Sequence, residues 1–535
     1  MRCTDDLEKS HQIALMSSIY KTARRVVIWL GKPTEATRNA LPALREVNGY
    51  LKRTLWFYDG TFLGLRLRAT YFGKWADATN PRTLTQRQIA KISGFDWASI
   101  VTVFRHRWFS RVWMCQEFTN ARDAVILVGY DEMPLVNLVS VYAELEFQGL
   151  RADLLSRHMG PDDWEPMMNI LGIGLMEANR QKIGVPKRKL AELMFDNRTR
   201  EATDDRDRIF AFVDIAGDVD ASDQELAPDY TVPVEEVYRR FALWYLMRKK
   251  DLQFLQYASP NCTSYLAGRY LPSWVPDWRQ AKFSTPIFRD FKSPYDASAN
   301  SKPEVRWGPE PDHLAIKGRI VDRVGQVAVT EAELEENHSA TSTYELEDTM
   351  TIWLSQCRRI AAMGAKRLTK EQFDAWWRLM GITGSPFSEE TVVEYLALVQ
   401  PAMWRRETPG PAAGGMTATD RAEVNPRHNV LRRMMVHRLS SFYQRRFCST
   451  TGGRLGWVPI TAKPGDIICI FHGAPVPFVL RPKMKEHQDP SVPFSTFAFD
   501  KAGFELVGEA YVDGMMYGAA FKDKWRVLDQ MFHLT

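Results

Sequence analysis

Cysteine is scarce in this sequence of 535 residues, and its six cysteines lie far apart from one another. No two of them form a C-x-x-C pair, and the zinc-binding motif H-E-x-x-H does not occur. Such spacing disfavours a disulfide framework and gives no support for a preformed zinc site. It is typical of reduced thiols, so we expect a cytoplasmic protein without a bound metal.

Long hydrophobic runs and a strong excess of one charge are also missing. The longest apolar stretches, such as VVIWL at 26–30, fall far short of the roughly 18 residues that suggest a membrane span. The polar, acidic start of the chain is unlike a signal or transit peptide. Lysine and arginine (70) exceed aspartate and glutamate (65) by only five. We therefore expect neither a membrane span nor a nucleic-acid partner.

The signatures of several enzyme classes are absent. The sequence has no G-x-x-x-x-G-K-[ST] phosphate loop and no G-x-S-x-G nucleophile elbow. His106 and Cys115 are nine residues apart across the start of an expected helix, which disfavours a Cys–His dyad. These absences imply no cofactor and leave enzymatic activity open.

Helix and strand patterns alternate in the first quarter of the chain. Asp5 predicts the start of a helix with apolar residues at helical spacing, and VVIWLG (26–31) predicts a strand buried on both faces. The order returns at 108–129, where Ser110 is the expected N-cap and AVILVG (124–129) a second buried strand. Two such units predict an α/β domain with a parallel sheet.

The remainder of the chain changes character in stages. We expect a mainly helical middle region and a β-rich carboxyl-terminal region, where GDIICIF and FELVGEAYVDG predict short strands between glycine turns. The Pro- and Gly-rich TPGPAAGGMTATD is the best linker candidate. The predicted divisions are 1–135 (with an insertion at about 36–100), 136–300 (helical), 301–407 (mixed α+β), 408–420 (linker) and 421–535 (β-rich).

Several sequence blocks together resemble one family. EKSHQIALMSSIYKTARRVVIWLG (8–31) and WFSRVWMCQE (108–117) are similar to two blocks of the fungal heterokaryon-incompatibility (HET) domain. REATDDRDRIFAFVDIAGD (200–218) and APDYTVPVEEVY (227–238) resemble blocks downstream of that domain. The positions that carry the resemblance include Glu8, Gln12, Tyr20, Trp29, Gly31, Trp108, Arg111, Trp113, Gln116 and Glu117.

The resemblance implies a fold and a role. It implies a partial TIR-like, flavodoxin-like domain that triggers or regulates programmed cell death in fungal non-self recognition, a form of innate immunity, through protein partners or self-association. The family's first blocks, Y-x-x-L-S-Y-x-W-G and W-I-D-x-x-C-I-N-Q, have no counterpart here. We therefore expect the first strands of the domain to be missing, through a late gene start or a natural truncation. An inactive truncated member of the family is accordingly one of the alternatives to a functional protein.

Glu117 has two competing interpretations. Some TIR domains hydrolyse NAD through a glutamate, and a carboxylate can stabilise an oxocarbenium-like centre, so Glu117 is the catalytic candidate if NAD is a substrate. Alternatively, Glu117 accepts from Arg111 or from a backbone donor, while Trp108 and Trp113 anchor the helix. The second interpretation is favoured, because a likeness of fold does not establish an activity.

Three further motif residues are interpreted as structural. Gln116 is expected to form hydrogen bonds in the core or at an interface, and Tyr20 and Trp29 to be core aromatics. The acids of TDDRDR (203–208) could hold Mg²⁺. Their alternation with arginines favours a helix cap and local ion pairs instead.

Overall fold

The chain divides into two compact units in a computed structural model. The N-terminal unit comprises Met1–Phe241 with Trp278–Ala281, and the C-terminal unit Ala242–Asp277 with Lys282–Thr535. The predicted linker at 408–420 lies outside the described residues. The structure describes residues 5–54, 84–147, 150, 188–220, 222–258, 271–280, 286–287, 294–308, 312–329, 353–365, 368–380, 445–483, 503–522 and 529–535.

The first helix begins where the sequence predicts it. Helix α1 (Asp6–Thr22) is capped by Asp5, whose carboxylate accepts from the backbone N–H of Leu7 at 2.9 Å and of Glu8 at 3.2 Å. Its apolar face is largely uncovered, because Ser17 is its only buried residue and Ile19 is 59% exposed. Spacing predicted the helix, but packing decides which face is covered.

A three-stranded sheet follows the helix. Strands β1 (Val26–Trp29) and β2 (Ala124–Val128) pair in parallel, which confirms the parallel arrangement predicted for the two apolar segments. Strand β3 (Asp131–Pro134) pairs antiparallel to β2 and completes the order β1-β2-β3.

Strand β1 is an edge strand of this sheet, and its residues alternate between buried and exposed. Val27 is 54% and Trp29 is 60% exposed. The predictions that β1 is buried on both faces and that Trp29 is a core aromatic are therefore wrong. The other face, with Val26 and Ile28, is buried, because only this side of the strand is packed against the unit.

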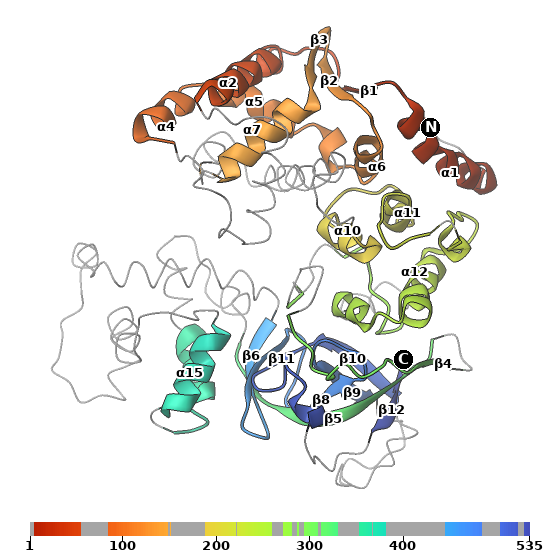
Figure 1. Ribbon diagram of the computed structural model, residues 1–535, viewed down its shortest axis with the longest axis vertical. Coiled ribbons are helices and arrows are strands. Elements are labelled where there is room, and N and C mark those ends of the chain that lie inside the picture. The colour runs from red at the N-terminus through yellow and green to blue at the C-terminus, as the bar shows by residue number, and fades with distance from the viewer. Residues whose placement is uncertain are drawn as a thin grey trace, which may run out of the picture. The chain divides into compact units, whose positions relative to one another are not determined.

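Helices gather beside the sheet in the N-terminal unit (Figure 1). Helix α2 (Ala40–Thr54) buries Leu44, Val47 and Leu51 and packs on two later helices. The described part of 36–100 is thus helical and contributes to the core. The helices that complete this layer are α4 (Gln86–Ser93), α5 (Trp97–Phe104) and α7 (Leu135–Phe147).

The segment around Ser110 departs from its predicted form. Residues 107–110 form a 3₁₀ turn, η2 (Arg107–Ser110), and helix α6 (Met114–Thr119) starts four residues after Ser110. The Ser110 hydroxyl donates to the Arg107 carbonyl at 3.0 Å, so the predicted N-cap is wrong. The extended backbone of Arg111 pairs in parallel with Glu201, and this bridge delays the helix.

Short helices complete the unit downstream. Helix α11 begins inside the TDDRDR segment, at Asp207, and its N-cap residue Arg206 makes no side-chain cap bond, so the predicted helix cap is wrong. Helix α12 starts just after Pro233. The last two residues of α12 belong to the C-terminal unit. The elements are α10 (Leu190–Asp196), α11 (Asp207–Val213), η5 (Gln224–Leu226) and α12 (Val234–Leu243).

The C-terminal unit contains a closed ring of strands (Figure 1). The long strand β5 pairs with β12 near its start and with β8 further along, so β5-β12-β10-β9-β8 returns to β5. Its β-rich character was predicted. The strands are β4 (Val305–Trp307), β5 (Leu314–Val327), β6 (Arg445–Thr450), β7 (Leu455–Pro459), β8 (Ile467–Phe471), β9 (Phe478–Lys483), β10 (Gly503–Glu509), β11 (Tyr511–Val512) and β12 (Gln530–Leu534).

Aromatic side chains fill the interior of the closed ring of strands. The phenyl groups of Phe471 on β8 and Phe532 on β12 have centroids 5.8 Å apart although their strands are not neighbours, so the two side chains meet across this interior. Phe504 contacts Phe532, and Phe478 contacts Phe471. Gly318 lies where β5 passes from β12 to β8, and a Cβ there would approach the Ile470 carbonyl to 2.7 Å. The close approach of two strands explains this glycine.

A helical layer covers β6 and β7. The Trp353 ring, in a helix at 353–361, stacks on Trp457 with centroids 5.8 Å apart, and Trp457 Nε1 donates to the Leu379 carbonyl at 2.9 Å. Among the helices described here, none is long and apolar enough to cross a membrane. The remaining helical elements of the unit are η6 (Trp244–Lys249, π-helical), η7 (Leu252–Tyr257), α15 (Lys370–Leu379) and α20 (Ala519–Lys522).

Candidate functional site

The structure gathers Tyr20, Trp108, Arg111 and Glu117, which we call the motif cluster. Trp108 Nε1 donates to Glu117 Oε2 at 2.7 Å, and Arg111 Nη1 lies 4.0 Å from Glu117 Oε1. The Glu117 side chain is 13% exposed. Its carboxylate therefore accepts from an indole N–H and faces a guanidinium, both from the turn just before its own helix.

Tyr20 of α1 completes the cluster. Burial, followed by the negative charge of Glu117, raises the pKa of Tyr20 to about 12, and the charge of Arg111 opposes this only in part. The phenol thus stays protonated at neutral pH. Arg111 has a side chain that is 52% exposed, so it is the member of the cluster most open to solvent.

Two other motif residues reach the segment after α10. Trp113 hydrogen-bonds to the Asp207 carboxylate, and Gln116 Nε2 donates to Asp214 Oδ2 at 3.1 Å. Gln116 is 1% exposed, so it lies in the core of the unit. The motif helix is therefore tied to residues about a hundred positions away in the sequence.

The TDDRDR segment contacts α1 through ion pairs. Asp204 accepts from Lys9 Nζ at 2.9 Å and from Arg206 Nε at 2.9 Å, and Asp205 pairs with Arg208 at 3.3 Å. The local ion pairs predicted from the alternating charges are therefore confirmed. Within the described residues, no group of three or more His, Cys, Asp or Glu side chains could hold a metal ion.

Tyr230 links these charges to α11. Its hydroxyl donates to Asp207 Oδ1, and burial together with the charge of Asp207 raises the pKa of Tyr230. Lys9 Nζ lies 3.7 Å from the centroid of the Tyr230 ring, and the Arg206 guanidinium lies 5.0 Å from it. Two cations over one ring join the start of the chain to the segment APDYTVPVEEVY (227–238), which we call the DY block.

A buried arginine supports the turn before the motif helix. Arg200 is 1% exposed and donates to the Phe109 carbonyl and to Asn197 Oδ1, the latter at 2.6 Å. Cys115 Sγ donates to the same Asn197 oxygen at 3.4 Å, and burial raises the pKa of its thiol to about 11. His106 instead accepts from the Trp108 N–H through Nδ1 at 3.2 Å. These contacts give Cys115 and His106 separate structural roles.

The remaining predicted residues lie away from the motif cluster. Gln12 Nε2 donates to Glu8 Oε1 at 2.8 Å on α1. Gly31 has a φ of +100°, which explains why glycine ends the W-L-G block, and its carbonyl accepts from the Gly129 N–H at 2.9 Å. Trp29 precedes this turn and is largely exposed.

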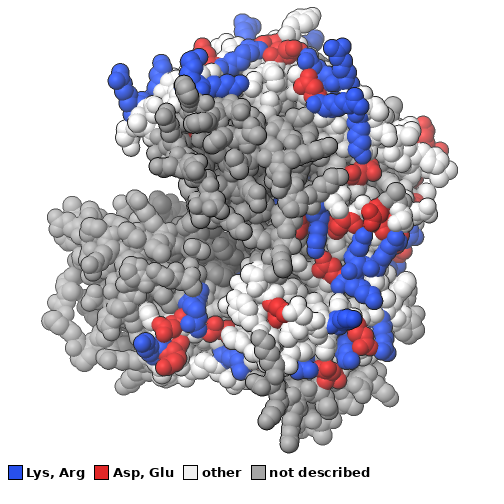
Figure 2. Space-filling model, in the orientation of Figure 1, with Lys and Arg blue, Asp and Glu red and all other residues white. Residues whose placement is uncertain are grey.

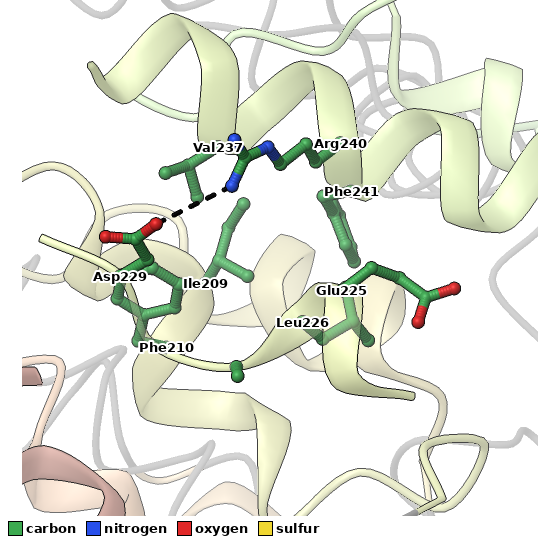
Figure 3. A pocket seen from close by; sticks show the side chains of 9 residues that line it. Ile209, Phe210, Glu225, Leu226, Asp229, Val237, Arg240 and Phe241 are labelled. Carbon is green, nitrogen blue, oxygen red and sulfur yellow. Dashed lines mark ion pairs between the residues drawn. The ribbon is translucent and has the colours of Figure 1, made fainter. Parts of the chain in front are cut away.

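A small cavity adjoins the DY block (Figure 3). Its walls are mostly apolar, and Arg240 forms an ion pair with Asp229 across one side at 3.7 Å. The free volume of about 10 Å³ has room for no more than one water molecule, so this is a packing gap and not a ligand site. The lining residues are Ile209, Phe210, Glu225, Leu226, Ala227, Asp229, Val237, Arg240 and Phe241.

Sequence reasoning missed Lys9, Asp204, Asp207 and Arg200 as partners of the motif residues. The signal was present, because all four lie inside blocks that resemble the family. Those blocks were interpreted one at a time, whereas the structure joins them through contacts such as Lys9–Asp204 and Trp113–Asp207. Order along the chain does not disclose which blocks touch.

We expect Asp204 to make the free energy of unfolding of the N-terminal unit decrease at acid pH. Burial raises its pKa, but the hydrogen bonds from Arg206 and Lys9 prevail and hold the pKa at about 2, below the ordinary 3.8. A depressed folded-state pKa stabilises the fold above pH 4, and this contribution is lost as the pH falls from about 4 to about 2. We expect Asp204→Asn to remove about 2 kcal/mol of unfolding free energy at pH 7.

The measurement is urea denaturation of the full chain at pH 7 and at steps down to pH 2.5. The difference between parent and Asp204→Asn should shrink as the pH falls. Asp123→Asn is the matched control, because Asp123 pairs with Arg25 at the surface. A difference that is constant across this range would contradict the proposed origin of the stability.

Comparison with known proteins gives two family matches and one relative. Residues 2–117 match the family described as heterokaryon incompatibility protein (HET), and residues 427–527 match the Het-6 beta-barrel domain. The chain is 24% identical to heterokaryon incompatibility protein 6, OR allele, of Neurospora crassa. The alignment spans 582 residues and covers 96% of this chain and 79% of the relative. No solved structure matches the chain.

Proposed function

We propose that this chain, a heterokaryon-incompatibility (HET) domain protein, acts in fungal heterokaryon incompatibility and there triggers or regulates programmed cell death on contact with non-self. The observation that carries the proposal is the pair of matches, HET at 2–117 and Het-6 barrel at 427–527, within one alignment to a heterokaryon incompatibility protein. The resemblance of separate sequence blocks points in the same direction.

The geometry of the motif cluster favours a signalling role. Glu117 accepts a hydrogen bond from Trp108 and faces Arg111, and the same helix is tied to Asp207 and Asp214. A carboxylate held in this way stabilises the position of α6. We infer that the motif cluster maintains the conformation of a recognition surface. We also infer that the protein acts in the cytoplasm through protein partners or self-association.

The alternative is a TIR-like hydrolase with NAD as its substrate. The parallel pairing of β1 and β2 supports a flavodoxin-like relationship at the level of the sheet. In this case Glu117 would stabilise the ribosyl cation, with Tyr20 and Arg111 beside it. The alternative requires Glu117 to exchange its hydrogen bond with Trp108 for a contact with substrate.

Induced expression of the parent chain and of Glu117→Gln in fungal cells separates the two functions. The glutamine oxygen can still accept from Trp108 Nε1, so the variant keeps the fold and removes only the charge. We expect equal loss of viability with both chains at matched protein levels, and unchanged cellular NAD. Glu35→Gln is the control, because Glu35 lies exposed in the same unit and outside the family motif.

The other outcomes favour the alternative or count against both functions. Death and NAD depletion with the parent, and neither with Glu117→Gln, would establish a glutamate-dependent hydrolase. Normal growth and normal NAD with the parent at high protein level would contradict both functions for this chain.

A further inference from the structure

A groove lies between α2 and the end of α4 in the N-terminal unit, and it shares no residue with the motif cluster. Its volume of about 420 Å³ is within the range of small-molecule sites, roughly 300–1,000 Å³. The two helices contribute charged and aromatic side chains to it. The lining residues are Arg45, Glu46, Gly49, Tyr50, Arg53, Lys91 and Phe95.

Positive charge dominates this groove. Three of its residues are cations and one, Glu46, is an acid. Arg45 is engaged with Asp131, its Nη1 lying 3.2 Å from Asp131 Oδ2. Arg53 and Lys91 have no ion pair in the part of the chain that the structure describes. Figure 2 shows lysine and arginine side chains gathered along the surface over α2 and α4, with fewer acids among them.

An aromatic pair lines the same groove. The rings of Tyr50 and Phe95 have centroids 5.8 Å apart and are inclined at 59°, and both residues are half-buried. Lys91 Nζ lies 5.8 Å from the Phe95 centroid. Partly exposed rings beside cations provide a face for a planar group next to a site for its negative charge.

The position of Gly49 is a separate observation that favours a ligand site in this groove. It lies in the interior of α2, where glycine is a poor helix former. A Cβ at this position would lie 3.4 Å from Arg53 Nη1, so the missing side chain leaves room beside the guanidinium. Cations at the end of α2 also complement the helix dipole, but the dipole explains neither this glycine nor Lys91 and the ring pair.

We propose that the groove binds a nucleotide. Arg53 and Lys91 hold its phosphates, and its planar base packs against Tyr50 and Phe95. Guanidinium and ammonium groups are the side chains that recognise phosphate, and aromatic rings accept any base by stacking. This binding is independent of the proposed role in incompatibility, because neither Glu117 nor its partners take part.

Titration calorimetry of the full chain with ATP tests the charged part of the site. Arg53→Gln combined with Lys91→Gln should weaken binding at least about tenfold, since each removes a charge-assisted hydrogen bond. Lys52→Gln with Arg87→Gln is the control, because it removes two cations from the same helices but none from the groove. The control should change binding by less than about twofold at physiological salt.

Inorganic triphosphate and two further variants test the ring site. ATP should bind more tightly than triphosphate, and Phe95→Leu should reduce that difference. Gly49→Ala should weaken ATP binding while leaving the melting temperature unchanged or higher, because alanine favours the helix but adds a methyl group to the groove lining, 3.4 Å from Arg53 Nη1. A purely structural glycine would not separate affinity from stability in this way.

Four results would overturn the proposal. The first is that the parent does not bind ATP at millimolar concentration, and the second is that the groove and control double variants weaken ATP binding equally. The third is that triphosphate binds as tightly as ATP, and the fourth is that the chain binds phosphatidylserine vesicles but not ATP. The second would assign the effect to diffuse charge, and the last to a membrane surface.

Discussion

Glu509→Ala is expected to destabilise the C-terminal unit by about 3–5 kcal/mol, the cost of breaking a buried ion pair. Arg445 and Glu509 are 1% and 2% exposed, and Arg445 Nη2 donates to Glu509 Oε1 at 2.5 Å. Burial raises the pKa of Glu509, against the lowering effect of Arg445. Without the carboxylate, the guanidinium loses its buried charged partner Glu509 and retains the backbone carbonyl of residue 509, at 3.0 Å.

Chemical denaturation of the full chain measures this loss, and two variants control it. Asp513→Ala removes the carboxylate that pairs with Arg378. The Arg378 side chain is 50% and the Asp513 side chain 24% exposed, so this change should lower the free energy of unfolding by less than about 1 kcal/mol. Arg445→Met combined with Glu509→Leu removes both charges and should recover most of the stability. A double variant as unstable as Glu509→Ala would refute the unpaired charge as the cause.

Arg200→Ala is expected to destabilise the N-terminal unit by about 3–5 kcal/mol and to abolish any activity that depends on the motif helix. The substitution opens a cavity and leaves two buried acceptors, the Phe109 carbonyl and Asn197 Oδ1, without their donor. Asn197 also accepts from Cys115, so the loss reaches α6 directly.

Arg107→Ala is the matched control for Arg200→Ala. Arg107 lies on η2, the turn that Arg200 supports through the Phe109 carbonyl. Its side chain is 85% exposed and pairs with Glu201 at 3.3 Å. We expect Arg107→Ala to change the free energy of unfolding by no more than about 0.5 kcal/mol and to leave the effect of the chain on cell viability unchanged. Thermal unfolding and the viability assay would show both, and equal damage from the two variants would mean that burial of Arg200 is not the reason for its effect.

The local features of this fold follow from neighbouring residues. Asp5 lies just before the first helix and accepts from its backbone donors, and Gly31 adopts the positive φ that ends β1. The strand at 467–471 lies between turns at 464–465 and 472–473, as its flanking glycines predict. Such features depend on a few consecutive residues, so their signals stay within a short window of sequence.

Burial could not be predicted with the same success. Trp29 is apolar and lies in a strand, yet it is 60% exposed because β1 is at the edge of the sheet. Ser110 has the chemistry of an N-cap, but the bridge between Arg111 and Glu201 moves the helix start to Met114. In both cases a partner distant in sequence decided the outcome.

The sequence by itself determined the start of the first helix, the strand segments, the parallel pair and the family resemblance, because these depend on side-chain periodicity and on short motifs. Only the tertiary structure decided that Trp108 donates to Glu117, that Trp113 reaches Asp207, and that β5 closes a ring with β8 and β12. The physical reason is that hydrogen bonds and ion pairs act over a few ångströms, and folding alone brings residues nearly a hundred positions apart to that distance.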